Sequence, residues 1–453
     1  MMFQKRLFRM MLAAVALTTV VSCSKNNDDE EEILPPPTNT IITGSLSANI
    51  TLTADKNWTL KGYVYVPNNI TLTIEPGTVI TSDVTEKGAL CIERGGKIIA
   101  NGTADKPIVF TSGKAVGSKA PGDWGGIVIL GKAKTNRSST PVIEGGLDRP
   151  YGGTDDADNS GSLKYVRIEY AGIAAFANSE INGLTLGAVG KGTVIENVQV
   201  VYGNDDAYEF FGGTVDAKYL VAYATADDDF DFDFGYTGRI QFAVALRDPL
   251  FVDAGDAGNG VEADNDGSGT AATPVTHPVL SNFTWIGPNN ATGTLGNHNY
   301  GNRWRRAAQF EVYNSVMLGW QKGGFSMESN ETAQSYKDGL SEFKNNVVHS
   351  NNNSDVARLG SSSQPVTVLS KSELDAKLVA DNNTVLTSPD NVLTAPFNLT
   401  APNLAPAAGG PAAGGVDFSG LDNTFFTATT YKGAVGSATN WLQGWTRFPA
   451  KGQ

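Results

Sequence analysis

The sequence contains few of the residues that form disulfides, zinc sites or membrane spans. Two cysteines among 453 residues exclude a disulfide scaffold and a cysteine-rich metal module. The three histidines, His277, His298 and His349, are too far apart for a sequence-local zinc motif. Beyond roughly the first 25 residues, no apolar run is long enough to cross a bilayer as a helix.

Positive charge is also scarce. The chain has 34 Lys and Arg against 47 Asp and Glu, which gives a net charge of −13. Because an acidic surface repels the phosphate backbone, we expect no nucleic-acid partner. Glycine, in contrast, is abundant, with 51 residues. This composition favours one long repetitive domain over two or three ordinary ones.

Residues 1–22 have the features of a secretory signal peptide. A basic start with Lys5, Arg6 and Arg9 precedes a short apolar run. The run ends in Val-Val-Ser before Cys23 and resembles a bacterial lipoprotein signal, in which the cysteine carries the lipid and becomes the first residue. The resemblance implies that Cys23 is lipidated.

An acidic and proline-containing segment, residues 23–40, follows the signal peptide. We expect it to be a solvated, disordered tether. Acidic residues directly after the lipidated Cys23 resemble the signal that sends lipoproteins of the Bacteroidetes group to the outer cell surface. We therefore expect a lipid anchor in the outer membrane, with the protein facing the cell exterior. Cys91 then has no partner and is predicted to be a buried small hydrophobe.

From residue 41 the chain reads as short alternating strands separated by Gly, Asn and Asp. One segment of the form apolar-x-Asn/Tyr-apolar-x-apolar recurs, with copies that begin at Leu163, Ile195, Ala217, Leu280, Val312 and Phe343. A further copy is expected around Arg239–Val244. A second, acidic segment interleaves with the first. Two strands per repeat are typical of a parallel β-solenoid, in which stacking supplies the core. We expect the in-register asparagines of the first segment to form an amide ladder, with members Asn197, Asn282, Asn314 and Asn345.

Several segments resemble known proteins. Residues 100–112, 122–127 and 163–170 resemble right-handed parallel β-helix proteins of bacterial surfaces. The segments 205–213, 260–265 and 431–445 are similar to a group of lipid-anchored cell-surface proteins from Bacteroidetes. The resemblance implies an all-β fold, a right-handed parallel β-helix with an irregular C-terminal capping segment. It implies a cell-surface location and no established activity.

These patterns divide the chain into a signal peptide (1–22), a lipidated acidic tether (23–40), a parallel β-helix (41–350) and a C-terminal extension (351–453). Within the extension, Lys371–Val379 is expected to form a short helix and Ala401–Gly415 a surface linker. The aromatic residues at the end of the chain are expected to cap the last turn of the solenoid. The alternative for them is an exposed carbohydrate-stacking patch.

The acidic segment predicts a dense column of carboxylates. Asp229, Asp231 and Asp233 alternate with three phenylalanines, so the phenylalanines should enter the core while the aspartates face water. Stacking in register adds Glu209 and Glu262, each about 5 Å from Asp231 across adjacent strands. The whole expected column is Glu209, Asp231, Glu262, Arg305 and Glu328.

Three interpretations of this column remain open. It could be a salt-bridged charge ladder in which Arg305 neutralises the acids. It could hold Ca²⁺, which accepts six to eight oxygen ligands in flexible geometry, with Glu209, Asp231 and Glu262 as metal ligands. It could also be a catalytic or sugar-binding groove.

Comparison with β-helix enzymes bears on the third interpretation. Polygalacturonase-like hydrolases place paired aspartates on one turn, and Asp205 and Asp206 are similar. Those enzymes also need a Gly-His-Gly motif on a following turn, and no histidine occurs between Asp206 and His277. Pectate-lyase-like enzymes use Ca²⁺ on carboxylates with an Arg or Lys base, and Arg303, Arg305 and Arg306 are candidates for that base.

The sequence thus favours a lipid-anchored β-helix that binds glycans or serves as a surface scaffold or adhesion module. Its expected partners are the outer membrane, reached through the lipid on Cys23, and a polysaccharide or surface protein. The alternative is a Ca²⁺-dependent polysaccharide lyase or glycoside hydrolase. The catalytic candidates are Glu209, Asp231, Glu262 and Arg305, and the further ligand-binding candidates are Asp205, Asp206, Asp229, Asp233 and Asp264.

Overall fold

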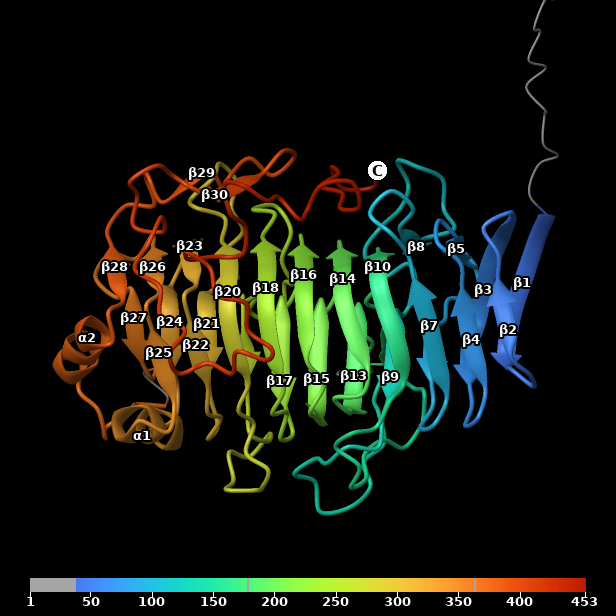
Figure 1. Cartoon of the computed structure of the whole chain (residues 1–453), viewed down its shortest axis with the longest axis horizontal. Coiled ribbons are helices and arrows are strands. Elements are labelled where there is room, and N and C mark those ends of the chain that lie inside the picture. Colours follow the sequence, from blue (N-terminus) through green and yellow to red (C-terminus); the bar gives the residue numbers. More distant parts are fainter. Residues whose placement is uncertain (1–37, 177–178, 362–363) are drawn as a thin grey trace, which may run out of the picture. The chain divides into compact units, whose positions relative to one another are not determined.

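The computed structural model describes residues 38–176, 179–361 and 364–453 (Figure 1). The predicted signal peptide, the lipidation site Cys23 and nearly all of the tether lie outside these ranges. Among the described residues, no helix is both long and apolar enough to cross a membrane.

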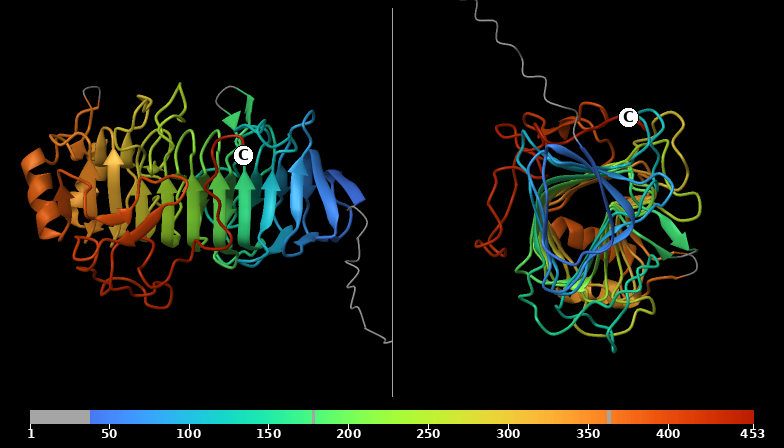
Figure 2. Two further views of the ribbon diagram at one scale, coloured as in Figure 1. Left: turned by 90° about the horizontal axis from the view of Figure 1, so that it is seen from above. Right: turned by 90° about the vertical axis from the view of Figure 1, so that its right-hand side faces the viewer.

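The described chain coils into a parallel β-helix built on one sheet of 26 strands (Figures 1 and 2). The first coils contain β1 (Thr38–Ser45), β2 (Ile50–Leu52), β3 (Lys56–Val66), β4 (Thr71–Ile74), β5 (Val79–Ser82), β6 (Leu90–Ile92), β7 (Lys97–Asn101), β8 (Ile108–Thr111), β9 (Ile127–Leu130) and β10 (Gly161–Glu169). The middle coils contain β13 (Leu184–Val189), β14 (Val194–Val201), β15 (Tyr208–Gly213), β16 (Ala217–Tyr223), β17 (Phe230–Asp233), β18 (Arg239–Leu246), β19 (Glu262–Ala263) and β20 (Val279–Ile286). The last coils contain β21 (Tyr300–Trp304), β22 (Glu311–Tyr313), β23 (Val316–Trp320), β24 (Gly323–Met327), β25 (Glu342–Lys344), β26 (Val347–Ser350), β27 (Ala357–Leu359) and β28 (Thr384–Leu386). The predicted all-β parallel β-helix is confirmed.

Two smaller antiparallel pairs lie beside the main sheet. They are β11 (Ala174–Phe176) with β12 (Ser179–Glu180), and β29 (Leu393–Ala395) with β30 (Asn403–Pro406). The parallel sheet itself runs from Thr38 to Leu386, so it begins before and ends after the predicted range 41–350. The additional coils at its end contain short strands, in which the alternation of apolar and polar residues is too brief to be recognised in the sequence.

Successive coils add one strand to each face of the solenoid. β10, β14, β16, β18 and β20 pair in that order on one face, and β9, β13, β15, β17, β19 and β21 pair in order on another. The recurring sequence segment lies on the first of these faces. The expected extra copy around Arg239–Val244 is β18, which pairs with β16 and β20 and is therefore confirmed.

The third position of the recurring segment is a corner of the coil. There the backbone turns to positive φ, 54° at Asn197, 60° at Tyr219, 56° at Asn282 and 52° at Asn314. Asparagine tolerates this left-handed conformation better than most residues, which explains part of the motif. The predicted amide ladder differs from what is observed. Asn197 lies between two tyrosines in register, and the amides of Asn282 and Asn314 donate to the C-terminal segment.

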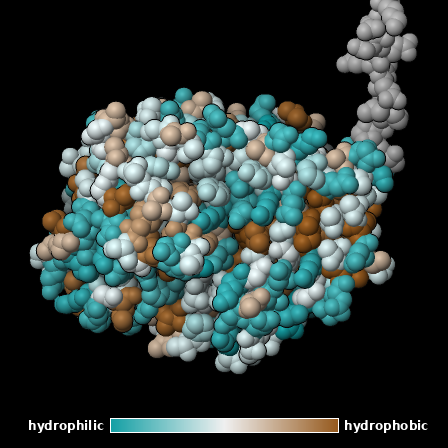
Figure 3. Space-filling view, in the orientation of Figure 1, coloured by the Kyte–Doolittle hydropathy of each residue, from teal (hydrophilic) through white to brown (hydrophobic). Residues whose placement is uncertain are grey.

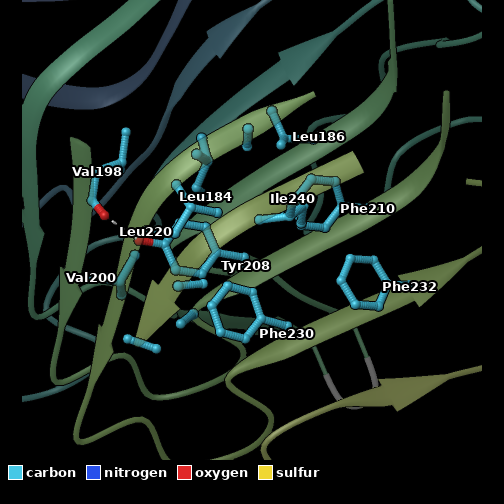
Figure 4. Packing of buried hydrophobic residues seen from close by; sticks show 14 of the residues in the cluster. Leu184, Leu186, Val198, Val200, Tyr208, Phe210, Leu220, Phe230, Phe232 and Ile240 are labelled. Atoms are coloured by element: carbon cyan, nitrogen blue, oxygen red, sulfur yellow. Dashed lines mark hydrogen bonds between the residues drawn. The ribbon is translucent and has the colours of Figure 1, made fainter. Parts of the chain in front are cut away.

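Aromatic and aliphatic side chains stack inside the coils (Figure 4). The rings of Tyr208 and Phe230 are parallel within 6°, with centroids 5.1 Å apart. The Tyr208 hydroxyl donates to the carbonyl oxygen of Val198 at 2.7 Å, which satisfies this polar group inside the core. Cys91 is fully buried as predicted, and burial raises its pKa to about 12.

Two helices, α1 (Asn330–Asp338) and α2 (Lys371–Ala380), cover the C-terminal end of the solenoid (Figure 1). Leu374 and Leu378 of α2 and Tyr336 of α1 join the core of the coils. The helix predicted at Lys371–Val379 is therefore confirmed. Its start is fixed by a capping box between Ser370 and Glu373.

The last residues of the chain do not cap the final turn, so that prediction is wrong. They run back along the side of the middle coils, where Arg167 donates to the carbonyl oxygen of Trp445 at 2.9 Å and Gln199 donates to that of Arg447 at 2.7 Å. The predicted linker also packs, since Leu404 and Ala412 are buried.

Figure 3 shows the surface of one side of the protein, where small groups of apolar residues lie among polar residues.

Candidate functional site

A cluster of carboxylates lies on three adjacent coils, on β15, β17 and β19 and the turns that precede them. Glu209 is directly opposite Asp231, and Asp231 is directly opposite Glu262. This is the register expected from the sequence for these three residues. Neighbouring strands are about 4.8 Å apart, so the sheet keeps the backbones of these residues at that spacing whatever rotamers their side chains adopt.

The remainder of the predicted column differs from the register observed in the structure. The residue opposite Glu262 is Arg303 rather than Arg305, and the next is Ser326 rather than Glu328. The two predicted residues lie two positions further along the chain, directly after the ends of β21 and β24, and Arg305 still contacts Glu262. The shift arises because the two loops that flank β20, between β19 and β21, have no repeat pattern from which the register can be counted.

Asp229 also differs from its predicted position. β17 begins only at Phe230, so Asp229 lies in the preceding turn and is fully buried instead of facing water. One of its oxygens lies 3.1 Å from Nη1 of the equally buried Arg247. Phe234, with φ 50°, leaves the strand and packs outside the coil against Phe211. Asp229 is thus a structural ion-pair partner, while Asp231 and Asp233 remain on the outer side.

A second row of polar residues lies in the turns just before β13, β15, β17 and β19. The backbone N–H of Asp228 donates to the Asp206 carboxylate at 2.8 Å, and that of Asn259 donates to the Asp228 carboxylate at 2.6 Å. The Asn182 amide donates to Glu209 at the start of this row. Asp227, Asp228 and Asn182 were not predicted. The signal was available, because the pairs Asp205-Asp206 and Asp227-Asp228 both end two residues before an aromatic strand start.

Two groups of three carboxylates have the spacing of a metal site. One consists of Asp205, Asp206 and Asp227, and the other of Asp206, Glu209 and Asp231. In each group the ligand oxygens lie within 4.8 Å of one another. Ca²⁺ binds oxygens at about 2.3–2.6 Å, so ligands on opposite sides of the ion lie about 5 Å apart. The donor set therefore fits a hard divalent cation.

The pKa values of these carboxyls reflect their burial and then their crowding. Burial, together with the nearby carboxylates, raises the pKa of Asp206, Glu209 and Asp231 well above the usual range. The same causes raise the pKa of Asp205 to about 7. Oδ1 of Asp231 is enclosed and makes no hydrogen bond to any residue that the structure describes. A bound cation would remove this repulsion and return the carboxyls to their ionised form.

Arginines neutralise the other end of the cluster. Nη1 of Arg303 lies 2.7 Å from Glu262, and its Nε lies 3.0 Å from Glu328. Arg305 contacts Glu262 and binds Asp264 through both Nε and Nη2, at 3.0 and 2.7 Å. Of the predicted metal ligands, Glu209 and Asp231 therefore belong to a carboxylate group, whereas Glu262 is held by arginine. The cluster combines a charge ladder at one end with a cation-binding set at the other.

The loop between β9 and β10 lies beside this cluster. Burial and the Asp205 carboxylate raise the pKa of Glu144, on this loop, to about 7. Between the loop and the coil is a cavity of about 400 Å³ whose lining includes Glu144, Tyr151 and Arg137. The guanidinium of Arg137 lies 4.4 Å from the ring centre of Phe234, also in the lining. The cavity therefore brings the Glu144 carboxyl together with an aromatic and cationic wall.

Comparison with known proteins agrees with the architecture. A family model described as a pectate-lyase-like beta-helix domain matches residues 44–390. Neither the search of curated proteins nor that of solved structures produced a match. The family match spans the parallel coils almost from the first strand to the last, and it covers well over half of the sequence. The chain therefore belongs to the family of pectate-lyase-like beta-helix domains.

Proposed function

We propose that this protein binds an acidic polysaccharide at the cell surface through a divalent cation, for which Ca²⁺ is the first candidate. The observation that carries the proposal is the pair of three-carboxylate groups that share Asp206. A cation held there by three protein oxygens keeps further coordination positions for carboxylate and hydroxyl oxygens of a uronate. The lipid expected on Cys23 would hold the protein in the outer membrane, facing the exterior.

The net charge of the chain supports the proposal that polysaccharide binding depends strictly on the cation. With a net charge of −13, the protein repels a polyanion in the absence of a counter-ion. A cation at Asp206 reverses the local field where the polysaccharide would lie. Arg306 is 41 % exposed beside Asp264 and offers a second positive contact at the edge of the same surface.

A lyase or hydrolase is the second candidate. The observation in its favour is that Glu144 and Asp205 both have a pKa of about 7, the range suited to proton transfer. The arginines are less suited to act as a lyase base. Although burial opposes the charge on Arg303 and Arg305, Glu262 raises the pKa of both guanidiniums above the ordinary value. Binding is therefore the function that the geometry supports better.

Retention on immobilised polygalacturonate and alginate tests the proposal, with about 5 mM CaCl₂, which exceeds the Kd of about 1 mM of weak protein sites, or with EDTA. We expect retention only with Ca²⁺ and its loss in Asp206→Asn. The matched control is Asp375→Asn, which removes an exposed carboxylate on α2 and should be retained as the unchanged protein is.

Analysis of the polysaccharide after incubation separates the two candidates. Intact chains support binding, while shortened chains with unsaturated ends identify a lyase and shortened chains without them a hydrolase. If the protein is not retained with Ca²⁺ and leaves the polysaccharides intact, the proposed function is wrong.

A further inference from the structure

A second cavity, of about 750 Å³, lies between the C-terminal segment and the corner of the middle coils. This volume is within the range of about 300–1,000 Å³ that is typical of small-ligand sites. Its coil side is formed by β10, β14, β16 and β18, whereas the acidic cluster lies on β15, β17 and β19 of another face. It is therefore separate from the site described above. We call it the tail cleft.

The floor of the tail cleft is aromatic because of the coil corner. Tyr165, Tyr219 and Phe242 occupy the corner position, with φ of 51°, 60° and 61°, and they line the cleft. The rings of Tyr219 and Phe242 are parallel within 9°, with centroids 5.2 Å apart. Trp441, from the C-terminal segment, meets Tyr219 at 61° and 5.2 Å and forms a wall at an angle to the floor. Tyr165, Tyr219 and Trp441 are each only partly buried.

Hydrogen bonds fix the wall of the tail cleft in place. The Gln241 amide donates to the carbonyl oxygen of Thr427 at 2.7 Å and accepts from its N–H at 2.8 Å. The indole of Trp441 donates to Ala434 at 2.8 Å, and the indole of Trp445 donates to Trp441 at 2.7 Å. A ligand would therefore enter a preformed site and would not have to order the C-terminal segment.

The polar groups of the tail cleft are uncharged. Exposed amides and hydroxyls of Asn440, Gln443 and Thr439 line it beside the rings, and no Asp, Glu, Lys or Arg is among its described lining residues. In a chain of which 18 % of residues are charged, this is a neutral surface. An ionised ligand would find no counter-charge there.

We propose that the tail cleft binds a neutral oligosaccharide. The apolar C–H face of a pyranose ring suits the aromatic floor and the Trp441 wall, and its hydroxyls suit the amides and hydroxyls at the rim. A simple hydrophobic ligand would leave those polar groups unpaired, which costs binding free energy. This site does not depend on the cation site, so the protein would hold two kinds of glycan at once.

Calorimetric titration of the purified protein with cellohexaose, mannohexaose, laminarihexaose and xylohexaose tests this inference. We expect at least one of these neutral probes to bind, with equal affinity in CaCl₂ and in EDTA. Trp441→Ala should weaken that binding tenfold or more. Ala428→Arg, which fills the cleft from an exposed position and leaves the hydrogen bonds of the wall intact, should do the same.

Two controls make the result decisive. Ala380→Arg places the same substitution at an exposed position of α2, and Asp206→Asn disables the cation site, so both should bind the neutral probe as the unchanged protein does. The inference is overturned if none of the four probes binds at millimolar concentration. It is also overturned if binding survives Ala428→Arg or disappears with EDTA.

Discussion

At the scale of single residues, the unusual feature of this protein is a set of carboxyls held too close together to ionise freely. Their positions follow from strand register, since Glu209, Asp231 and Glu262 are direct neighbours across β15, β17 and β19. The sequence was sufficient to predict these three because the aromatic alternation fixes which residues face outwards. It was insufficient for Arg303, because the register there depends on the lengths of the two loops that flank β20.

Asp231→Asn tests whether the crowding is repulsive in the absence of metal. The amide keeps the shape and removes one charge, so we expect the variant to melt at a higher temperature than the unchanged protein in EDTA at pH 8. Relief of one close pair is worth about 1–4 kcal/mol, the range between bulk water and a protein surface. In CaCl₂ the order should reverse, because the variant lacks one ligand. Identical melting in both buffers would contradict both the repulsion and the metal site.

The pH dependence of stability follows from the same carboxyls. The folded-state pKa of Glu144 and Asp205 is about 7, well above the ordinary values of 4.5 and 3.8. The folded state therefore binds protons that the unfolded state releases between about pH 4 and pH 7, so stability falls as the pH rises through this window. We expect thermal melts in EDTA to show a higher melting temperature at pH 5.5 than at pH 8.

Addition of CaCl₂ provides the control for the pH experiment. A bound cation favours the ionised carboxyls, so the difference between pH 5.5 and pH 8 should shrink or change sign. A melting temperature that rises from pH 5.5 to pH 8 in EDTA would be inconsistent with the raised pKa values.

At the scale of elements, each coil is joined to the next by the corner motif and by stacked interior rings. Sequence repeats revealed the strands, including β18, whose copy of the motif carries Phe242 at the corner. They did not reveal the function of the corner asparagines. The reason is that the partners of Asn282 and Asn314 belong to a segment over a hundred residues away, without any repeat of its own.

Asn282→Ala tests the attachment of the C-terminal segment. The Asn282 amide lies within 3.2–3.3 Å of oxygens of Thr429, Tyr431 and Gly433, and its loss also leaves an alanine at φ 56°. We expect a loss of about 2–3 kcal/mol in unfolding free energy and faster proteolysis between residues 427 and 440. Urea titration and timed trypsin digestion would measure these effects.

Asn345→Ala is the matched control, because Asn345 occupies the same corner at φ 58° and no hydrogen bond joins its side chain to the described C-terminal segment. It should lower stability without faster cleavage of that segment. Equal cleavage in both variants would show that the Asn282 amide does not hold it.

At the scale of the whole molecule, the solenoid formed by the described residues presents two chemically different surfaces. The acidic cluster lies on β15 and β17 and the turns before them, while the neutral tail cleft lies on the corners of β10, β14, β16 and β18. Repetition explains why the fold was predictable from the sequence, since the same pattern of apolar and polar residues recurs in successive coils. The path of the last residues was not predictable, because a single segment that docks along the side has no pattern to count.

The lipid anchor expected from the sequence gives a further prediction. Replacement of Cys23 by Ala removes the only position at which the sequence expects lipid, so the protein should move from the membrane fraction to the soluble fraction. Metabolic labelling with a palmitate analogue should mark the unchanged protein and leave Cys23→Ala unlabelled. A labelled variant would place the lipid elsewhere, and an unlabelled protein that stays with membranes would exclude a lipid anchor.

The most direct test of the cation site is calorimetric titration of the purified, metal-free protein with CaCl₂. Asp206 belongs to both carboxylate groups, so we expect saturable binding by the unchanged protein and none by Asp206→Asn. The exposed control Asp375→Asn should bind as the unchanged protein does. Absence of binding by the unchanged protein, or unaltered binding by Asp206→Asn, would contradict the assignment of these carboxylates to a metal.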